Sequence, residues 1–207
     1  MLFSNPALSI LLVGLVFILA FGALSFLRRQ GISARFAVEG LIVTAVGAVA
    51  ASFVAVNILA FLIVLYLITM RVRLLADVGN WLTASRRYEQ ALSVYRFALR
   101  LSPDVPSRQI VLINQGVTQL YMKEPQAAVT SLEEALSYGQ LGAKYLSAGH
   151  YNLGLAYKRV GRKAEAVREF NRAIDAWPAS IYATHARAAL EKMREPDDRG
   201  PDAGESD

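Results

Sequence analysis

Apolar and polar positions divide the chain at about residue 70 into two unequal parts, which we call its first and second halves. Residues 7 to 27 form an apolar run without a charged side chain, and residues 41 to 70 form a longer one. Beyond residue 71, apolar positions recur at the three- and four-residue spacing that is typical of amphipathic helices. Because about 20 helical residues cross a bilayer, the pattern predicts a membrane-embedded first half and a helical second half.

The two apolar runs are expected to be two transmembrane spans, within a transmembrane region of residues 1 to 70. Residues 7 to 27 are interpreted as a retained span, because no basic residue precedes them and Arg28 and Arg29 follow directly. No Pro or polar turn interrupts residues 41 to 70, so they are predicted to form one tilted helix of about 45 Å. A re-entrant hairpin over the same residues is the alternative.

Small residues at four-residue intervals in the second run indicate close packing of the two spans. An amide within the same run is expected to face another helix, because it needs a hydrogen-bond partner in lipid. The residues expected to pack in this way are Gly47, Ala51, Ala55 and Asn57. Their expected neighbours on the first run are Gly14, Ile18 and Gly22.

A two-span arrangement places both chain ends on one side of the membrane, and the positive-inside rule then gives conflicting answers. Arg28, Arg29 and Arg35 favour a cytoplasmic loop, whereas Arg71 and Arg73 favour a cytoplasmic second half. We expect the second half to be cytoplasmic.

One order of small and aromatic residues occurs three times in the second half. Its glycines and its alanines return after 37 and then 38 residues, at Gly79, Gly116 and Gly154 and at Ala91, Ala128 and Ala166. In the third unit this order is Leu153, Gly154, Tyr157, Ala166, Phe170 and Pro178. Between about residues 72 and 178 the chain therefore resembles the tetratricopeptide-repeat (TPR) family, whose units are helical hairpins. The middle unit departs from the pattern at Gln119, where an aromatic residue is usual.

The expected fold class is all-α: a two-span transmembrane hairpin, then a three-repeat TPR-like α-solenoid that ends in a capping helix. The TPR domain is expected over residues 71–195, with repeats at about 72–105, 109–141 and 147–178 and the capping helix at 179–195. No helix breaker separates Met70 from Leu75, so the second apolar helix should continue into the first repeat. Residues 196–207 read as a disordered acidic tail.

The residues that carry chemistry do not form a recognisable active site. The chain has no Cys, its two His fall on different helices, and it has no Gly-rich phosphate loop. No catalytic, cofactor or metal site is therefore expected, and the protein is predicted not to be an enzyme. A basic cluster near residue 160 is compatible with lipid headgroups or acidic partners, but it lacks the interleaved aromatics of a nucleic-acid interface.

The resemblance implies a groove that the first helix of each hairpin lines. Amides at such positions offer a donor and an acceptor to an extended peptide, although solvent-facing polar residues are the alternative interpretation. The candidate groove residues are Asp77, Asn80, Asn114, Val117, Tyr121, Tyr151, Asn152 and Leu155. Ala76 and Ala148 occupy positions where a carboxylate-binding groove would need lysines, so recognition of acidic C-terminal tails is not predicted.

The resemblance implies a membrane-anchored scaffold or adaptor that holds a protein or peptide partner at the membrane, for instance as an assembly factor. The alternative is an accessory subunit that contacts a membrane complex through its transmembrane helices. Membrane lipid is an expected partner, and nucleic acid is not. By family analogy the location is a bacterial inner membrane or a photosynthetic membrane.

Overall fold

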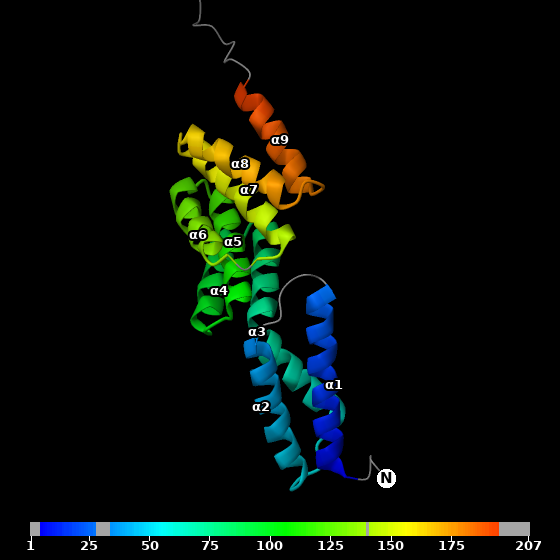
Figure 1. Cartoon of the computed structure of the whole chain (residues 1–207). Coiled ribbons are helices and arrows are strands. Elements are labelled where there is room, and N and C mark those ends of the chain that lie inside the picture. The colour runs from blue at the N-terminus through cyan, green and yellow to red at the C-terminus, as the bar shows by residue number, and fades with distance from the viewer. Residues whose placement is uncertain (1–4, 28–33, 140, 195–207) are drawn as a thin grey trace, which may run out of the picture. The chain divides into compact units, whose positions relative to one another are not determined.

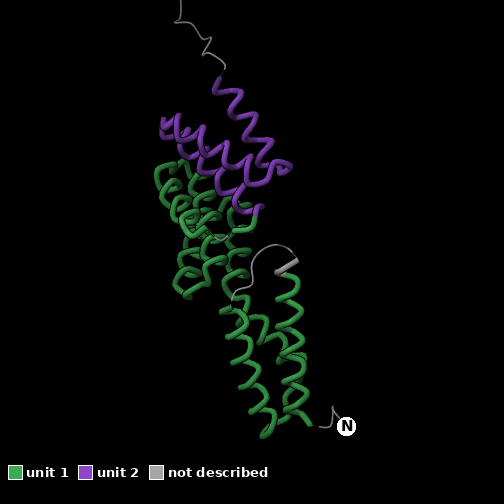
Figure 2. Tube along the Cα trace, in the orientation of Figure 1, with its two compact units in different colours: residues 1–142 green, residues 143–207 purple. Residues whose placement is uncertain are grey.

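The structure is a computed structural model that describes residues 5–27, 34–139 and 141–194, and its described secondary structure is α-helical (Figure 1). The chain divides into two compact units, residues 1–142 and residues 143–207 (Figure 2). Arg28, Arg29 and the predicted acidic tail lie outside the described residues.

Three apolar helices at the start of the first unit form a bundle that we call the stem. They are α1 (Pro6–Leu27), α2 (Ala34–Ala51) and the first part of α3 (Ile58–Ala84) (Figure 1). Each of the three helices is long and apolar enough to cross a membrane.

Close contacts in the stem show that neighbouring helices run antiparallel. A Cβ at Gly14 would collide with Thr44, and one at Gly40 would lie 2.9 Å from the side chain of Ile18, so α1 and α2 run in opposite directions. A Cβ at Gly47 would lie 2.7 Å from the ring of Phe61, which brings α3 against α2 in the same way. Gly14 and Ile18 thus contact α2, but at Thr44 and Gly40 and not at the expected small residues Gly47, Ala51 and Ala55. A Cβ at Gly22, however, would have no neighbour within 4 Å.

The prediction of one helix over residues 41–70 is wrong, because α2 ends at Ala51 and α3 begins at Ile58. Asn57 ends the intervening turn: its Oδ1 accepts a hydrogen bond from the backbone N–H of Ala60 at 3.1 Å. It therefore caps its own helix instead of facing another, and Ala55 is exposed in the turn rather than packed. An amide just before an apolar run is a helix-start signal, and Asn57 marks the break between the two helices in this way.

A carboxylate clamp joins α2 to α3 at the end of the stem that faces the repeats. Arg71 donates from Nη1 to Oε2 of Glu39 at 2.6 Å and from Nη2 to Oε1 at 2.9 Å. Arg35 donates from Nε to the same Oε1 at 2.7 Å. The bidentate geometry is the strong form of this interaction, so it fixes the register of the two helices.

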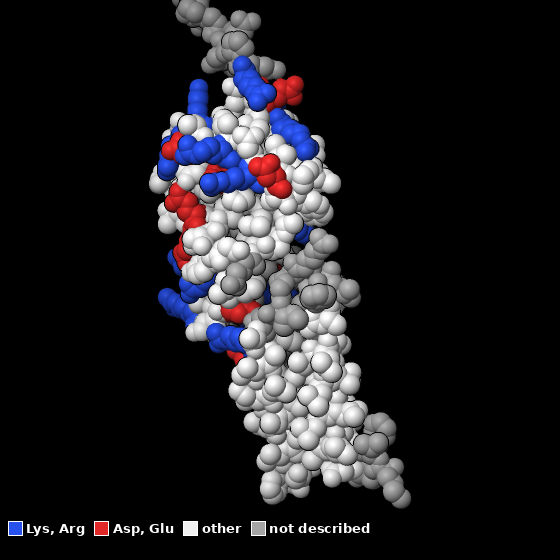
Figure 3. Space-filling view, viewed as in Figure 1, with Lys and Arg blue, Asp and Glu red and all other residues white. Residues whose placement is uncertain are grey.

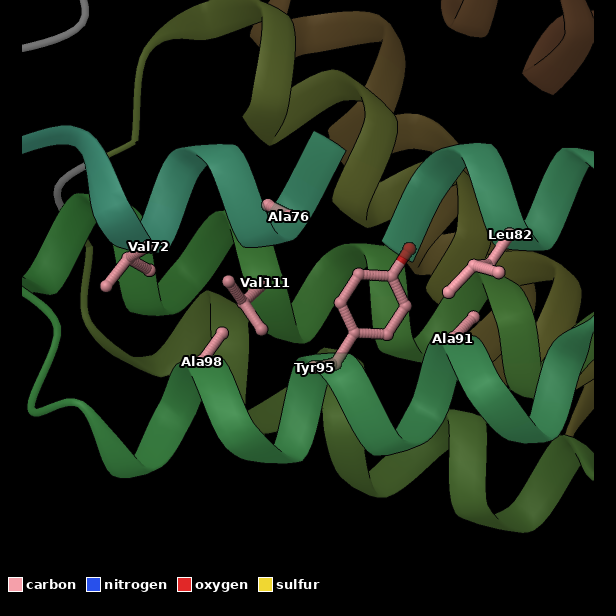
Figure 4. Close-up of a cluster of buried hydrophobic side chains, with 7 residues drawn as sticks. All are labelled: Val72, Ala76, Leu82, Ala91, Tyr95, Ala98 and Val111. Atoms are coloured by element: carbon pink, nitrogen blue, oxygen red, sulfur yellow. The ribbon is translucent and has the colours of Figure 1, made fainter. Parts of the chain in front are cut away.

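The helix α3 runs without interruption from the stem into the first helical hairpin, as the sequence predicts. There it packs against α4 (Tyr88–Arg100), and α5 (Val105–Tyr121) pairs with α6 (Pro125–Ser137). Figure 4 shows the core between them, where Tyr95 projects from α4 towards α3 beside the layer of Val72 and Ala98. A Cβ at Gly79 would collide with the Tyr95 ring, so this glycine sets the approach of the two helices.

The second unit contains α7 (Ala143–Arg159), α8 (Lys163–Ala176) and α9 (Ile181–Arg194). Gly154 on α7 faces the ring of Phe170 on α8, which repeats the arrangement of Gly79 and Tyr95. The helix α9 packs against both α7 and α8, where a capping helix is expected. Its start is held by Ser180, whose hydroxyl lies 2.7 Å from the buried hydroxyl of Ser147.

Candidate peptide-binding groove

A concavity lies in the first unit beside the ends of the helices that point away from the stem. It is formed by the last turns of α3, the first residue of α4 and the last turns of α5. The residues that line it are Asn80, Thr83, Ala84, Arg86, Tyr88, Asn114, Val117, Thr118 and Tyr121.

A small hydrogen-bond network holds the floor of this groove. The buried Tyr95 donates its hydroxyl hydrogen to Oδ1 of Asn80 at 2.8 Å. The hydroxyl groups of Thr83 and Thr118 lie 2.8 Å apart and join α3 to α5. Because these bonds orient the side chains before any ligand arrives, the floor is preorganised.

The network leaves hydrogen-bonding groups facing the groove. Asn80 accepts from Tyr95 through Oδ1, and no described acceptor engages its Nδ2. The side-chain amide of the half-buried Asn114 likewise has no hydrogen bond with a described residue. A backbone carbonyl or N–H of an extended peptide would satisfy both amides.

Two tyrosine rings form one wall of the groove. Tyr88 and Tyr121 stack with centroids 6.0 Å apart and an interplanar angle of 6°, and Tyr121 is 61% exposed. Rings presented in this way provide a large contact area at a small entropic cost. Arg86 alone among the lining residues carries a charge, and it adopts a left-handed backbone conformation with φ 60°.

Burial raises the pKa of the Tyr95 hydroxyl above its ordinary value, an effect that hydrogen bonds with Thr83 and Thr118 partly oppose. The phenol therefore remains protonated at neutral pH and acts as the donor that orients Asn80.

Four of the candidate groove residues lie together in this concavity, namely Asn80, Asn114, Val117 and Tyr121. Asp77 is exposed on α3 and is not among the lining residues. Sequence reasoning missed the other five lining residues, Thr83, Ala84, Arg86, Tyr88 and Thr118. The sequence contains a signal for Tyr88, because this residue begins the second helix of the first repeat directly after a basic turn.

The other three candidates belong to α7 in the second unit. The ring of Tyr151 lies 6.0 Å from those of Phe170 and Tyr182 and 5.8 Å from that of His185, measured between centroids. Asn152 donates from Nδ2 to the carbonyl of Ala148 at 2.8 Å, so part of its amide is engaged within its own helix. Leu155 is half-buried on the same helix.

The fold and the groove define a helical-repeat protein, a class whose surfaces bind other proteins. Comparison with known families gives the same result. Residues 74–109 and residues 148–179 each match a family described as tetratricopeptide repeat, so the first and third hairpins are repeats of this kind. No curated protein matches the chain.

Proposed function

We propose that the protein is a membrane-anchored TPR scaffold that holds an extended segment of a partner protein at a fixed height above the bilayer. The observation that carries this proposal is the continuity of α3, which contributes both to the apolar stem and to the groove. Asn80 follows Arg71 by nine residues, which is about 14 Å along a helix. A rigid helical connection, unlike a flexible tether, would keep the bound segment at that height.

The groove supports an extended occupant because its donors and its apolar wall lie side by side. A peptide backbone would pair with Asn80 and Asn114, and one of its apolar or aromatic side chains would lie on Tyr121. Arg86 would favour an acidic residue in the same segment. An assembly factor is one kind of protein that uses such a site.

The three-helix stem also supports a cytoplasmic location for the repeats. With α1, α2 and α3 antiparallel, Arg35, Arg71 and Arg73 all fall at the end of the stem that adjoins the repeats. Arg28 and Arg29 occur in the sequence between α1 and α2, which connect at that same end. The opposite turn, residues 52–57, has no charged residue. The conflict that a two-span arrangement created therefore disappears, and the positive-inside rule favours cytoplasmic repeats.

The alternative role, an accessory subunit that contacts its complex through the stem, loses the feature that suggested it. Gly47 packs against Phe61 of the same chain, and Ala51 is buried within the stem. Two members of the small-residue stripe, Gly47 and Ala51, are thus occupied by the protein's own helices, whereas Ala55 is exposed in the turn.

A photo-crosslinking residue at Val117 in the full-length chain tests the groove in living cells. We expect a discrete crosslinked product that the double substitution Asn80→Ala and Asn114→Ala strongly reduces. The matched control carries the crosslinker at the exposed Ser93 of α4, outside the groove. Equal products at the two sites, or a product that the double substitution leaves unchanged, would rule out the groove as the binding surface.

A further inference from the structure

The base of the first hairpin carries basic and aromatic side chains that the groove does not use. We define the hairpin base as Arg73 on α3 together with Arg96, Phe97 and Arg100 on α4. Val72 and Ala98 lie on opposite sides of the core in Figure 4, so Arg73, Phe97 and Arg100 lie near the level of this layer, on the side of the hairpin nearest the stem. Arg96 lies farther from the stem, next to Tyr95, whose ring packs against Gly79. On the face seen in Figure 3, the part of the stem away from the first hairpin shows no charged side chain, and charged residues begin towards that hairpin.

The register of the stem helices places the hairpin base close to a membrane surface. Gly14 on α1 packs against Thr44 on α2, so these two residues mark one level of the stem. From that level towards the first hairpin, α1 continues for 13 residues to Leu27, whereas Glu39 on α2 lies only five residues away. The apolar α1 therefore extends eight residues, or about 12 Å, past the level of the Glu39–Arg71 pair. The last turns of α4 therefore lie no farther along the stem than the end of α1, and an α1 that ends in the headgroup layer brings them into that layer.

The side chains of the hairpin base are available at that depth. Arg73, Arg96 and Arg100 form no ion pair with a described carboxylate, and Phe97 is 52% exposed. Asp104, an acidic residue at the same end of the hairpin, accepts a hydrogen bond from the backbone of Ser107 at 3.0 Å as the N-cap of α5. The arginines thus remain available for an external anion.

We propose that the hairpin base binds the phosphate groups of anionic phospholipids in the bilayer that holds the stem, with Phe97 inserted at the interface. Arginine is suited to phosphate because its guanidinium donates two parallel hydrogen bonds. An exposed ring beside the cations adds apolar burial in the headgroup zone. The contact would fix the tilt of the repeats relative to the membrane. This inference rests on the proposed membrane anchoring.

Fluorescence quenching in proteoliposomes tests the contact with the full-length chain. Trp81 and Trp177 are replaced by Phe and Phe97 by Trp, so that the single indole reports on the hairpin base. The protein is reconstituted with brominated phosphatidylcholine, with or without phosphatidylglycerol. We expect bromine to quench the indole, and phosphatidylglycerol to increase the quenching. A single indole at Tyr121, at the far end of α5, should remain unquenched.

Charge substitutions in the same single-indole chain test whether the arginines cause the phosphatidylglycerol-dependent quenching. Each arginine near an anionic surface contributes a factor of about five to the binding constant, so Arg96→Gln with Arg100→Gln should reduce the equilibrium constant of the lipid contact about 25-fold. The control pair, Arg87→Gln with Lys123→Gln, removes the same charge at the opposite end of the two hairpins and should leave quenching unchanged. Circular dichroism establishes that each variant is folded.

The outcomes separate this inference from the proposed function. The lipid contact is overturned if the chain inserts into the bilayer but phosphatidylglycerol does not change the quenching. It is also overturned if both pairs of charge substitutions change the quenching equally. Either result leaves the proposed anchoring intact. A chain that alkaline carbonate extracts from the vesicles overturns the anchoring and the lipid contact together.

Discussion

At the scale of single residues, glycine and tyrosine determine how the first hairpin closes and how its groove is supported. Gly79 leaves space on α3 for the ring of Tyr95, and the hydroxyl of that ring orients Asn80 in the groove. The periodic glycines were evident in the sequence, because they return at nearly constant intervals. The bond from Tyr95 to Asn80 was not, because it joins residues 15 positions apart on different helices.

Replacing Gly79 by Ala should destabilise the first unit, because the added Cβ collides with the Tyr95 ring. Overpacking of this kind costs about 1–3 kcal/mol, and the better helix propensity of Ala recovers less than about 1 kcal/mol of it. The measurement is thermal unfolding of the full chain in detergent. Gly22→Ala is the control, since that position has no neighbour within 4 Å, and it should be neutral or stabilising. Equal melting temperatures for both variants would contradict the packing role of Gly79.

Tyr95 should also make the first unit sensitive to high pH. Because burial raises its pKa, the folded protein holds the phenolic proton more tightly than the unfolded chain does. The associated stability is complete below the unfolded pKa of about 10 and is lost as the pH rises from there through the folded pKa. In Tyr95→Phe we expect the free energy of unfolding to fall by about 1 kcal/mol at neutral pH, because the hydrogen bond is missing. We also expect this free energy to decline less steeply in alkali than it does in the unchanged protein. Urea titrations at neutral and at alkaline pH measure both effects, and an unchanged alkaline decline would refute the assignment.

At the scale of elements, the stem differs most from what the hydropathy pattern predicts. Residues 41–70 form two helices, because Asn57 caps α3 and the chain turns back on itself between Ala51 and Ile58. Hydropathy has no feature that distinguishes an apolar turn from an apolar helix. The clamp at Glu39 explains how a carboxylate is accommodated in an apolar helix, because Arg35 and Arg71 pair with it.

Replacing Glu39 by Gln should loosen the association of α2 with α3, because it leaves Arg71 and Arg35 without their shared carboxylate. Hydrogen bonds to charged groups contribute about 1.5–3 kcal/mol to the free energy of unfolding. Because this cluster is partly exposed, we expect a loss at the lower end of that range. Arg35→Gln is the comparison variant, since it leaves the bidentate Arg71–Glu39 pair intact, and its effect should be smaller. Thermal unfolding in detergent provides the ranking. A larger loss in Arg35→Gln than in Glu39→Gln would contradict the clamp.

At the scale of the whole molecule, the number of stem helices would determine which parts of the chain share a side of the membrane that we propose the stem spans. Three antiparallel helices place the turn at residues 52–57 and the first TPR hairpin at opposite ends of the stem. Two spans would have placed the start of the chain and the hairpins on the same side.

Because the chain has no Cys, single cysteines can report on this topology. In intact cells we expect a membrane-impermeant maleimide to label Ser52→Cys, in the exposed turn after α2, and to leave Ser93→Cys on α4 unlabelled until the cells are lysed. The physical reason is that the arginines at the repeat end of the stem are retained in the cytoplasm. Labelling of Ser93→Cys before lysis would reverse the orientation, and protection of both sites would indicate a re-entrant α2–α3 hairpin.

The sequence by itself determined the all-helical fold, the repeat period and the continuity of α3 past Met70, because helical spacing and the absence of a breaker are local properties. It also selected Asn80, Asn114, Val117 and Tyr121, since each has a place in the repeat register. Only the tertiary structure decided the number of stem helices, the Glu39 clamp and the pairing of Tyr88 with Tyr121. These features depend on contacts between helices, which composition and spacing along one chain do not specify.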